Sequence, residues 1–426
     1  MASHAQGINT TSNGYRKFPD SRHNYATATS SARPSHHRVR TYTAHALVLF
    51  NVYGIVLSSG LWLEYYFTSL FPATSLLAVS AIFGTQLACL GLGVGVAASL
   101  HRRWPKHWRL LMSLGGLSVG CSHICVLIAD EFWVVLLCEG ALTGLGLGVL
   151  STVSTRVLST HYKNDIAVAS SQCVAAGFLG AVVYTIFTWL CLRSDNTKLG
   201  RGLIPTLLCL TLLPAVLLAK PSALQPVTHH SSPPARFATP RLSSMLFVIL
   251  YTPPFLATSL LLPLILTRHP SPYRADPGCY VLLALSSAAL LSSALLPHLP
   301  SHRLSPPALI AASTLLAGIA IPSLIWMPTL YVGVPCAMVL GAGLGGVCAL
   351  WVRALAALVG KGKRLGQAVC LLAAVGGVGA GCGVLGAAAV METWEAGVEI
   401  VLGVAAGCLV LGGLALGAGA GVRRWG

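Results

Sequence analysis

Twelve apolar runs dominate this sequence, each close to the roughly 20 residues that an α-helix needs to cross the hydrocarbon core of a bilayer. Apolar residues are continuous within a run rather than alternating with polar ones, which excludes an outer-membrane β-barrel. The runs cover 45–67, 75–100, 109–129, 132–155, 166–190, 201–219, 242–266, 277–297, 307–326, 329–352, 365–390 and 398–421. The sequence therefore predicts an all-α membrane protein with twelve transmembrane helices in two six-helix halves.

Composition excludes a soluble domain, because only 9% of the 426 residues are charged and 55% are hydrophobic, whereas soluble domains carry about 25% charge. The polar stretches between the runs predict the division of the chain. We expect a disordered cytosolic tail over 1–44, an N-terminal half over 45–219, a cytosolic central loop over 220–241, a C-terminal half over 242–421 and a cytosolic tail over 422–426.

Basic residues predict the orientation. With the N-terminus in the cytosol, 22 of the 27 Lys and Arg residues fall on the cytosolic side and five on the other side. Such a bias follows the positive-inside rule and places both termini in the cytosol. The net charge of +16 is then explained by orientation, so we expect no nucleic-acid partner. We expect a multi-pass, monomeric protein in the plasma membrane in preference to an organelle membrane.

Glycines are interpreted as packing positions. Gly140, Gly144 and Gly148 recur every four residues and predict one helix face that allows close helix contact. Gly341, Gly343 and Gly346 match a dinucleotide-binding pattern but lie in an apolar run with no strand before them. Scattered cysteines predict no metal site, and we expect neither a metal nor a cofactor.

Polar residues inside the runs are functional candidates, because burying an ionisable group in lipid costs several kcal/mol unless it is compensated. Glu139 lies about seven residues into the fourth run, roughly 10 Å below its outer end. Two interpretations stay open: a group that carries a proton or contacts a solute, or a protonated carboxyl bonded to a neighbouring helix. Pro253 and Pro254 predict a break in the seventh run.

Several motifs are similar to those of one family. The first run contains an Asn-Val-Tyr-Gly stretch at 51–54, then Gly60 and Tyr65-Tyr66, and the fourth contains a glycine-rich stretch at 139–148. His161-Tyr162-Lys163 is followed by small residues up to Gly180. In these positions the chain resembles the major facilitator superfamily, and more narrowly its fungal monocarboxylate-porter-like branch.

The resemblance implies a transporter with a central cavity lined by the first, fourth, seventh and tenth helices. By this resemblance the candidate substrate-binding or coupling residues are Asn51, Ser58, Ser59, Glu139, Thr143, Tyr251 and Thr252. Arg102, Arg103 and Lys106 correspond to the basic part of the family's gating loop, although the acid that normally accompanies them is missing.

The chain is therefore expected to be a secondary active transporter of a small organic solute, working by alternating access as a symporter or uniporter, with any proton coupling resting on Glu139. No Lys or Arg lies at mid-depth in the runs, so a neutral or amphipathic solute is as compatible as a monocarboxylate. The alternative is a non-transporting membrane sensor or scaffold that retains the fold, motivated by the missing loop acid. We expect no enzymatic activity, because no catalytic cluster has workable spacing.

Overall fold

The structure of the protein is a computed structural model that describes residues 36–128, 130–162, 165–193, 197–222, 242–267, 277–298, 305–326, 329–359 and 363–421. Contacts divide the chain into residues 1–36 and 37–426, and the helical bundle belongs to the second part. Most of the expected N-terminal tail, residues 223–241 of the expected central loop and the expected C-terminal tail lie outside the described residues.

The described residues are helical almost throughout. In the N-terminal half the elements are α1 (His36–Tyr65), η1 (Tyr66–Leu70), α2 (Leu76–Arg103), η2 (Pro105–His107), α3 (Trp108–Ile128), α4 (Phe132–Val135), η3 (Leu136–Leu142), α5 (Thr143–His161), α6 (Ile166–Arg193) and α7 (Thr197–Leu218). In the C-terminal half they are α8 (Leu242–Thr267), α9 (Pro277–Leu295), η4 (Leu296–His298), α10 (Pro306–Ala320), α11 (Ser323–Trp326), α12 (Leu330–Val359), α13 (Lys363–Thr393) and α14 (Gly397–Gly421).

Eleven helical segments of the described chain are long and apolar enough to cross a membrane, and the shorter apolar part of α7, Gly202–Leu218, is the twelfth. When the spans are numbered along the chain with α7 as the sixth, the fourth span combines α4, η3 and α5, and the ninth combines α10 and α11. Large apolar side chains such as Leu117, Leu210 and Leu217 stay exposed on these helices, as expected of surfaces that face lipid. The prediction of a twelve-helix, all-α membrane protein is confirmed.

The first helix begins earlier than the sequence predicts. α1 starts at His36, nine residues before the expected start, so residues 36–44 are helical rather than part of a disordered tail. Contacts with neighbouring segments stabilise this extension. The Thr41 hydroxyl donates a hydrogen bond to the Lys220 carbonyl at 2.8 Å, and the Arg38 guanidinium lies 4.1 Å from the ring centre of Tyr162.

The expected break in the seventh span is wrong. α8 runs unbroken from Leu242 to Thr267 with Pro253, Pro254 and Pro263 inside it. Proline removes a backbone donor, but membrane helices tolerate it where neighbouring helices pack closely. α13 packs against α8, and a Cβ added to Gly383 of α13 would lie 2.6 Å from the ring of Pro253.

Glycines join the fourth span to α2, as the four-residue spacing predicts. A Cβ added to Gly140, Gly144 or Gly148 would meet a backbone carbonyl oxygen of α2 at 2.8, 2.3 or 2.3 Å, those of Ile82, Gln86 and Leu90 in turn. Only the missing side chain allows the two backbones to approach this closely.

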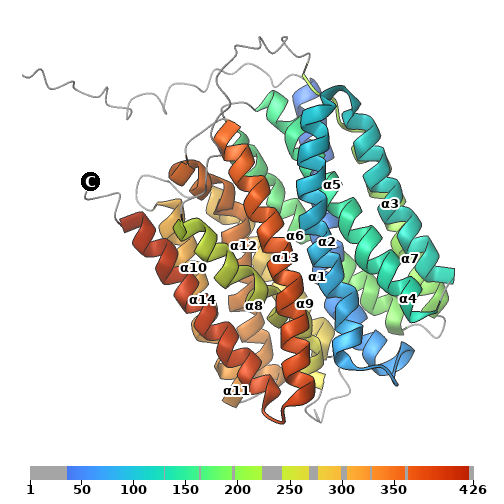
Figure 1. Cartoon of the computed structure of the whole chain (residues 1–426), viewed down its shortest axis with the longest axis vertical. Coiled ribbons are helices and arrows are strands. Elements are labelled where there is room, and N and C mark those ends of the chain that lie inside the picture. Colours follow the sequence, from blue (N-terminus) through green and yellow to red (C-terminus); the bar gives the residue numbers. More distant parts are fainter. Residues whose placement is uncertain are drawn as a thin grey trace, which may run out of the picture. The chain divides into compact units, whose positions relative to one another are not determined.

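The two halves meet along a seam made by α2 with α13 and by α6 with α9 and α12. Figure 1 shows α2 and α13 side by side. Glycines face each other here too, because a Cβ on Gly91 would lie 2.7 Å from the Ala374 carbonyl and one on Gly381 would lie 2.4 Å from the Gly84 carbonyl. Each half therefore presents a smooth backbone surface to the other.

At the end of the bundle that holds η1 and η3, the halves are also in contact through α1. Gly60 lies against the backbone of Leu260 in α8, and Leu61 packs with Cys279 and Leu282 of α9. The backbone N–H of Leu77 donates to the carboxylate of Glu392 at 2.9 Å. This end of the seam is closed in the structure.

We expect Gly144→Ala to destabilise the protein by about 1–3 kcal/mol, the usual cost of overpacking, because its methyl group would collide with the Gln86 carbonyl. Gly120→Ala on α3 is the matched control, since a Cβ there meets nothing within 4 Å. Thermal unfolding of the two variants in the same detergent measures the difference, and equal melting temperatures would contradict the packing described.

Candidate functional site

Glu139 is the one charged side chain among the buried residues of the described chain, with 4% of its surface exposed. The hydroxyl of Tyr66, itself 1% exposed, donates a hydrogen bond to the Glu139 carboxyl at 2.5 Å. The Tyr66 ring stacks on Phe83 of α2 at an interplanar angle of 12°. The buried acid in the fourth span is thus bonded to η1 at the end of the first span, as the interpretation of a carboxyl bonded to a neighbouring helix expects.

Both partners of this bond lie in π-helical segments. Tyr66 begins η1 and Glu139 lies inside η3. π-helical turns are rare and are found disproportionately at functional sites, because the extra residue per turn costs stability and redirects a side chain. Two such turns that meet through one buried hydrogen bond make this the most unusual local geometry in the described chain.

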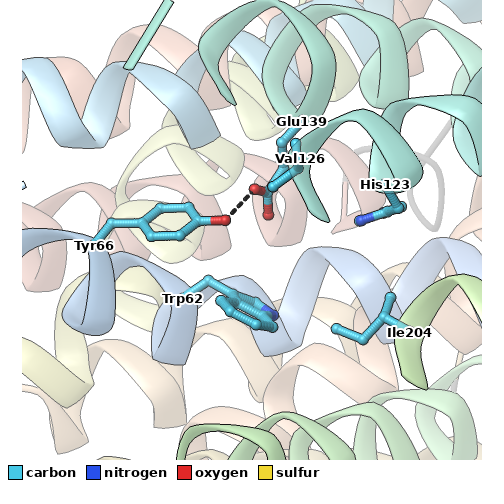
Figure 2. Close-up of a pocket in the computed structure, with 6 residues that line it drawn as sticks. All are labelled: Trp62, Tyr66, His123, Val126, Glu139 and Ile204. Carbon is cyan, nitrogen blue, oxygen red and sulfur yellow. Dashed lines mark hydrogen bonds between the residues drawn. The ribbon is translucent and has the colours of Figure 1, made fainter. Parts of the chain in front are cut away.

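A small cavity adjoins the bond. Its volume is about 20 Å³, and its lining residues come from four spans of the N-terminal half: Trp62, Tyr66, His123, Val126, Glu139 and Ile204. Figure 2 shows the His123 ring pointing toward the Glu139 carboxyl. The Nε2 atom of His123 is buried and has no hydrogen-bond partner among the described residues, which differs from the usual pairing of buried polar groups.

Asn51 of α1 joins three helices, because its side chain bonds to residues of α6 and α7. Its side-chain N–H donates to the Leu47 carbonyl at 2.7 Å, and its side-chain oxygen accepts from Tyr184 of α6 at 2.7 Å and from Thr211 of α7 at 2.8 Å. The side chain is 0% exposed. This arrangement places Asn51 inside the N-terminal half instead of between the halves.

Other expected lining residues are also engaged locally. Thr143 shares a 2.5 Å hydrogen bond with Ser122 of α3. Ser58, Ser59 and Thr252 donate to backbone carbonyls of their own helices. Within the described structure these hydroxyls are satisfied by helix contacts.

Tyr251 is the expected residue that the structure places between the halves. Tyr53 of α1 lies close to Cys348 of α12 and to Tyr251 of α8. The ring of Tyr53 also packs on Phe178 of α6, with 5.0 Å between centres. We call the place where Tyr53, Tyr251 and Cys348 meet the α1–α8–α12 junction. Sequence reasoning did not select Tyr53, although its aromatic ring in an apolar span was a visible signal.

A stack of aromatic rings continues from the junction. Phe247, Tyr251 and Phe255 follow one face of α8 with ring centres 5.2 Å apart and planes within 18° of parallel. Trp351 of α12 stacks on Phe247 at 5.8 Å. The Tyr251 hydroxyl is buried without a hydrogen-bond partner among the described residues. The junction therefore combines stacked aromatic rings with a buried hydroxyl that has no partner among the described residues.

The expected gating residues lie away from both sites, at the end of α2 and in η2. Arg102 bonds its own helix through the Ala98 carbonyl at 3.2 Å and the Ser99 hydroxyl at 3.3 Å. Arg103 lies over the ring of Trp104, and Lys106 is exposed in η2.

We expect Asn51→Ala to lower the free energy of unfolding by about 1–3 kcal/mol, because the Tyr184 hydroxyl loses its acceptor inside the bundle. The Thr211 hydroxyl, in contrast, keeps the Leu207 carbonyl as an acceptor. Thr211→Val removes the bond from Thr211 to Asn51 and is expected to cost less. Thermal unfolding in detergent checks the order, and an unchanged Asn51→Ala protein would contradict a structural role.

Comparison with known proteins gives limited sequence likeness. No family model matches the chain. It is 28% identical over 169 residues to the MFS-type transporter eupM of Phoma sp., covering 37% of this chain and 59% of that protein. It is also 28% identical over 169 residues to an MFS-type transporter of Gibberella zeae, covering 39% of this chain and 34% of that protein. The match thus spans less than two thirds of the length of either curated relative.

Solved structures match over nearly the whole chain. The crystal structure of the human organic anion transporter MFSD10 (TETRAN) aligns with a TM-score of 0.61 and 16% identity, covering 90% of this chain and 100% of that one. The nucleoside transporter NupG aligns with a TM-score of 0.66 and 12% identity, covering 90% and 99%. All four proteins are named as transporters, in agreement with the prediction that this chain is not an enzyme, and none of these names supports the monocarboxylate-porter-like branch. The chain therefore has the fold of the major facilitator superfamily and resembles its transporters in sequence.

Proposed function

We propose that the protein is a secondary active transporter that moves a small organic solute across a membrane by alternating access. The α1–α8–α12 junction carries this proposal. It lies between the two halves, where transporters built from two repeats bind their substrates, and it offers aromatic walls with a buried Tyr251 hydroxyl that has no partner among the described residues.

The seam between the halves supports the alternation. α2 and α13 touch through glycine backbones at Gly91 and Gly377, whose facing atoms leave no room for a side chain. Surfaces of this kind can shift against each other without disentangling long side chains, because little interdigitates across them. The closed contacts of α1 with α8 and α9 are then the ones that separate when this end opens.

The chemistry of the junction favours a neutral or amphipathic solute over a monocarboxylate. Tyr53, Tyr251 and Trp351 surround the junction with apolar ring surface, and the Tyr251 hydroxyl is the donor that a neutral solute would meet. A carboxylate would call for a buried cation, and Glu139 is the only charged residue among the buried ones described. A nucleoside, the solute in the name of the second structural match, is a neutral molecule of this kind.

We further propose that transport is coupled to protons at Glu139. The carboxyl lies in a π-helical segment of the fourth span, buried among helices of the N-terminal half and bonded to Tyr66 of η1. A buried acid of this kind is retained at a cost of several kcal/mol in lipid, which supports a role in binding an ion rather than in folding alone.

The orientation proposed from the basic residues places both termini and Arg102, Arg103 and Lys106 in the cytosol. The cavity beside Glu139 then lies toward the outer face. We propose a monomer in the plasma membrane with this orientation, and protease or tag accessibility in sealed vesicles tests it, because both ends must be reached from the same side.

The junction predicts the effect of Tyr251→Phe on transport. Solute counterflow of uridine, benzamide and benzoate into proteoliposomes is measured first, and the neutral aromatic probes are expected to exchange faster than benzoate. Tyr251→Phe is expected to raise the half-saturating concentration of the exchanged probe about fivefold to tenfold, the effect of losing one hydrogen bond of about 1 kcal/mol.

Tyr280→Phe on α9 is the matched control, because the Tyr280 side chain is exposed and the variant loses the same hydroxyl elsewhere. Counterflow of benzoate alone would contradict the neutral-solute proposal. No counterflow of any probe would favour the sensor or scaffold interpretation over transport.

Coupling at Glu139 predicts a second outcome. Glu139→Gln should remove the dependence of uptake on an inward proton gradient while leaving counterflow without a gradient, because the neutral amide keeps the shape of the side chain and cannot take up a proton. Uptake of the exchanged probe is compared with and without a pH difference. A gradient dependence that survives in Glu139→Gln would refute the coupling role.

A further inference from the structure

We propose that the cavity beside Glu139 binds one ordered water that joins its carboxyl to Nε2 of His123, so that proton uptake belongs to a three-part unit of carboxyl, water and imidazole. Tyr66 is the positioning residue that fixes the carboxyl by its hydrogen bond. This inference rests on the proposed proton coupling at Glu139. Binding of a proton in this cavity does not itself require that the protein transports a solute.

The size and lining of the cavity fit a single water. A cavity must offer about 10–15 Å³ to hold one buried water, and the water needs two to four polar partners. The cavity beside Glu139 measures about 20 Å³. Glu139 and Tyr66 bring oxygens to its wall, and His123 points toward them from α3 (Figure 2). The buried Nε2 of His123 has no partner among the described residues, so a bridging water would satisfy an atom that otherwise costs free energy.

Few other titratable groups face the unit from the elements packed against η3. α2 meets η3 through Ile82 and Thr85, α5 continues from it at Thr143, and α4 adds the apolar residues Phe132–Val135. On the side of α3, Cys125 interacts with Cys138 of η3.

The acids nearest along the chain, Asp130 and Glu131, lie in the connection before α4 and are exposed. His123 is therefore the basic group placed to exchange a proton with Glu139.

The transfer balances without a further reactant. A hydronium ion at the outer face first gives a proton to Nδ1 of the neutral His123 imidazole, which forms an N–H bond there and leaves a water molecule. The N–H bond at Nε2 then breaks as an O–H bond forms on the bridging water, while the water gives one of its own protons to the carboxylate. The water is regenerated, the imidazole is neutral again, and the net change is one proton on Glu139.

Protonation reaches the solute site through α1. Trp62 on this helix and Tyr66 in η1, which continues it, touch the cavity, and Tyr53 on α1 belongs to the junction. Neutralising Glu139 weakens its bond to the Tyr66 hydroxyl, since a hydrogen bond to a charged acceptor is about twice as strong as one to a neutral group. The π-helical turn η1 at the end of α1 is then released from η3, which frees the contacts of α1 with the other half.

Infrared difference spectroscopy tests the unit in the full chain reconstituted in lipid nanodiscs, with no solute present. Acidification is expected to produce the C=O band of a protonated carboxyl that Glu139→Gln abolishes. Tyr66→Phe should shift the frequency of this band because the donor is lost. His123→Gln should move its titration midpoint and remove a band of the bound water that shifts in H₂¹⁸O.

Two controls keep the outcome interpretable. Glu64→Gln removes the acid near the end of α1 that lies against Gly278 of α9, outside this cavity, and should leave the band in place. Circular dichroism and size-exclusion profiles must match the parent protein, and His123→Asn serves as a second variant where His123→Gln does not fold.

A carboxyl band that persists in Glu139→Gln, or a midpoint and water band unaffected at His123, would overturn the three-part unit. The outcome is separable from transport. Counterflow without the band leaves a transporter that takes up no proton here, whereas the band without counterflow leaves a proton site in a protein that does not transport.

Discussion

Close contact between helix backbones is the constraint on which this structure depends. In lipid, apolar side chains gain little by leaving the bilayer for one another, so helices associate through packing and hydrogen bonds. Gly144 and Gly148 seat the fourth span on α2 inside one half. Gly91 and Gly381 make the same kind of contact between α2 and α13 across the seam. α2 therefore takes part in both sets of contacts. If one half moves against the other, the displacement must occur where α2 meets α13.

α1 links the two candidate sites because it presents a different face to each. Residues seven apart on a helix lie on the same side, whereas residues two apart are separated by about 200°. Asn51 and Ser58 thus face the interior of their own half with Trp62 nearby, while Tyr53 and Gly60 meet the other half. A change at Tyr66 therefore acts on the same rigid helix that forms one wall of the junction.

The spans and the acid could be predicted from sequence because length, apolarity and a lone charge do not depend on how a helix is rotated. The rotation of each helix about its own axis could not be predicted. The polar residues of α1 are spread around its circumference, so no polar stripe indicates its outward face. Asn51 was therefore assigned to the cavity and Tyr53 was not, although the two residues are only two positions apart in the sequence. The early start of α1 was hidden for a related reason, because Thr41 and Arg38 are polar but find partners in Lys220 and Tyr162.

Polar groups buried in this bundle divide by whether the protein itself satisfies them. Asn51 and Thr143 are bonded to neighbouring helices, which fixes the N-terminal half as one body, since breaking such bonds in a low-dielectric interior is costly. The Tyr251 hydroxyl and Nε2 of His123 are buried without a described partner. A fold that only needed stability would gain from phenylalanine at Tyr251 and an apolar residue at His123. Retaining these two groups makes sense if each exchanges partners during a cycle, the first with a solute between the halves and the second with a proton inside one of them.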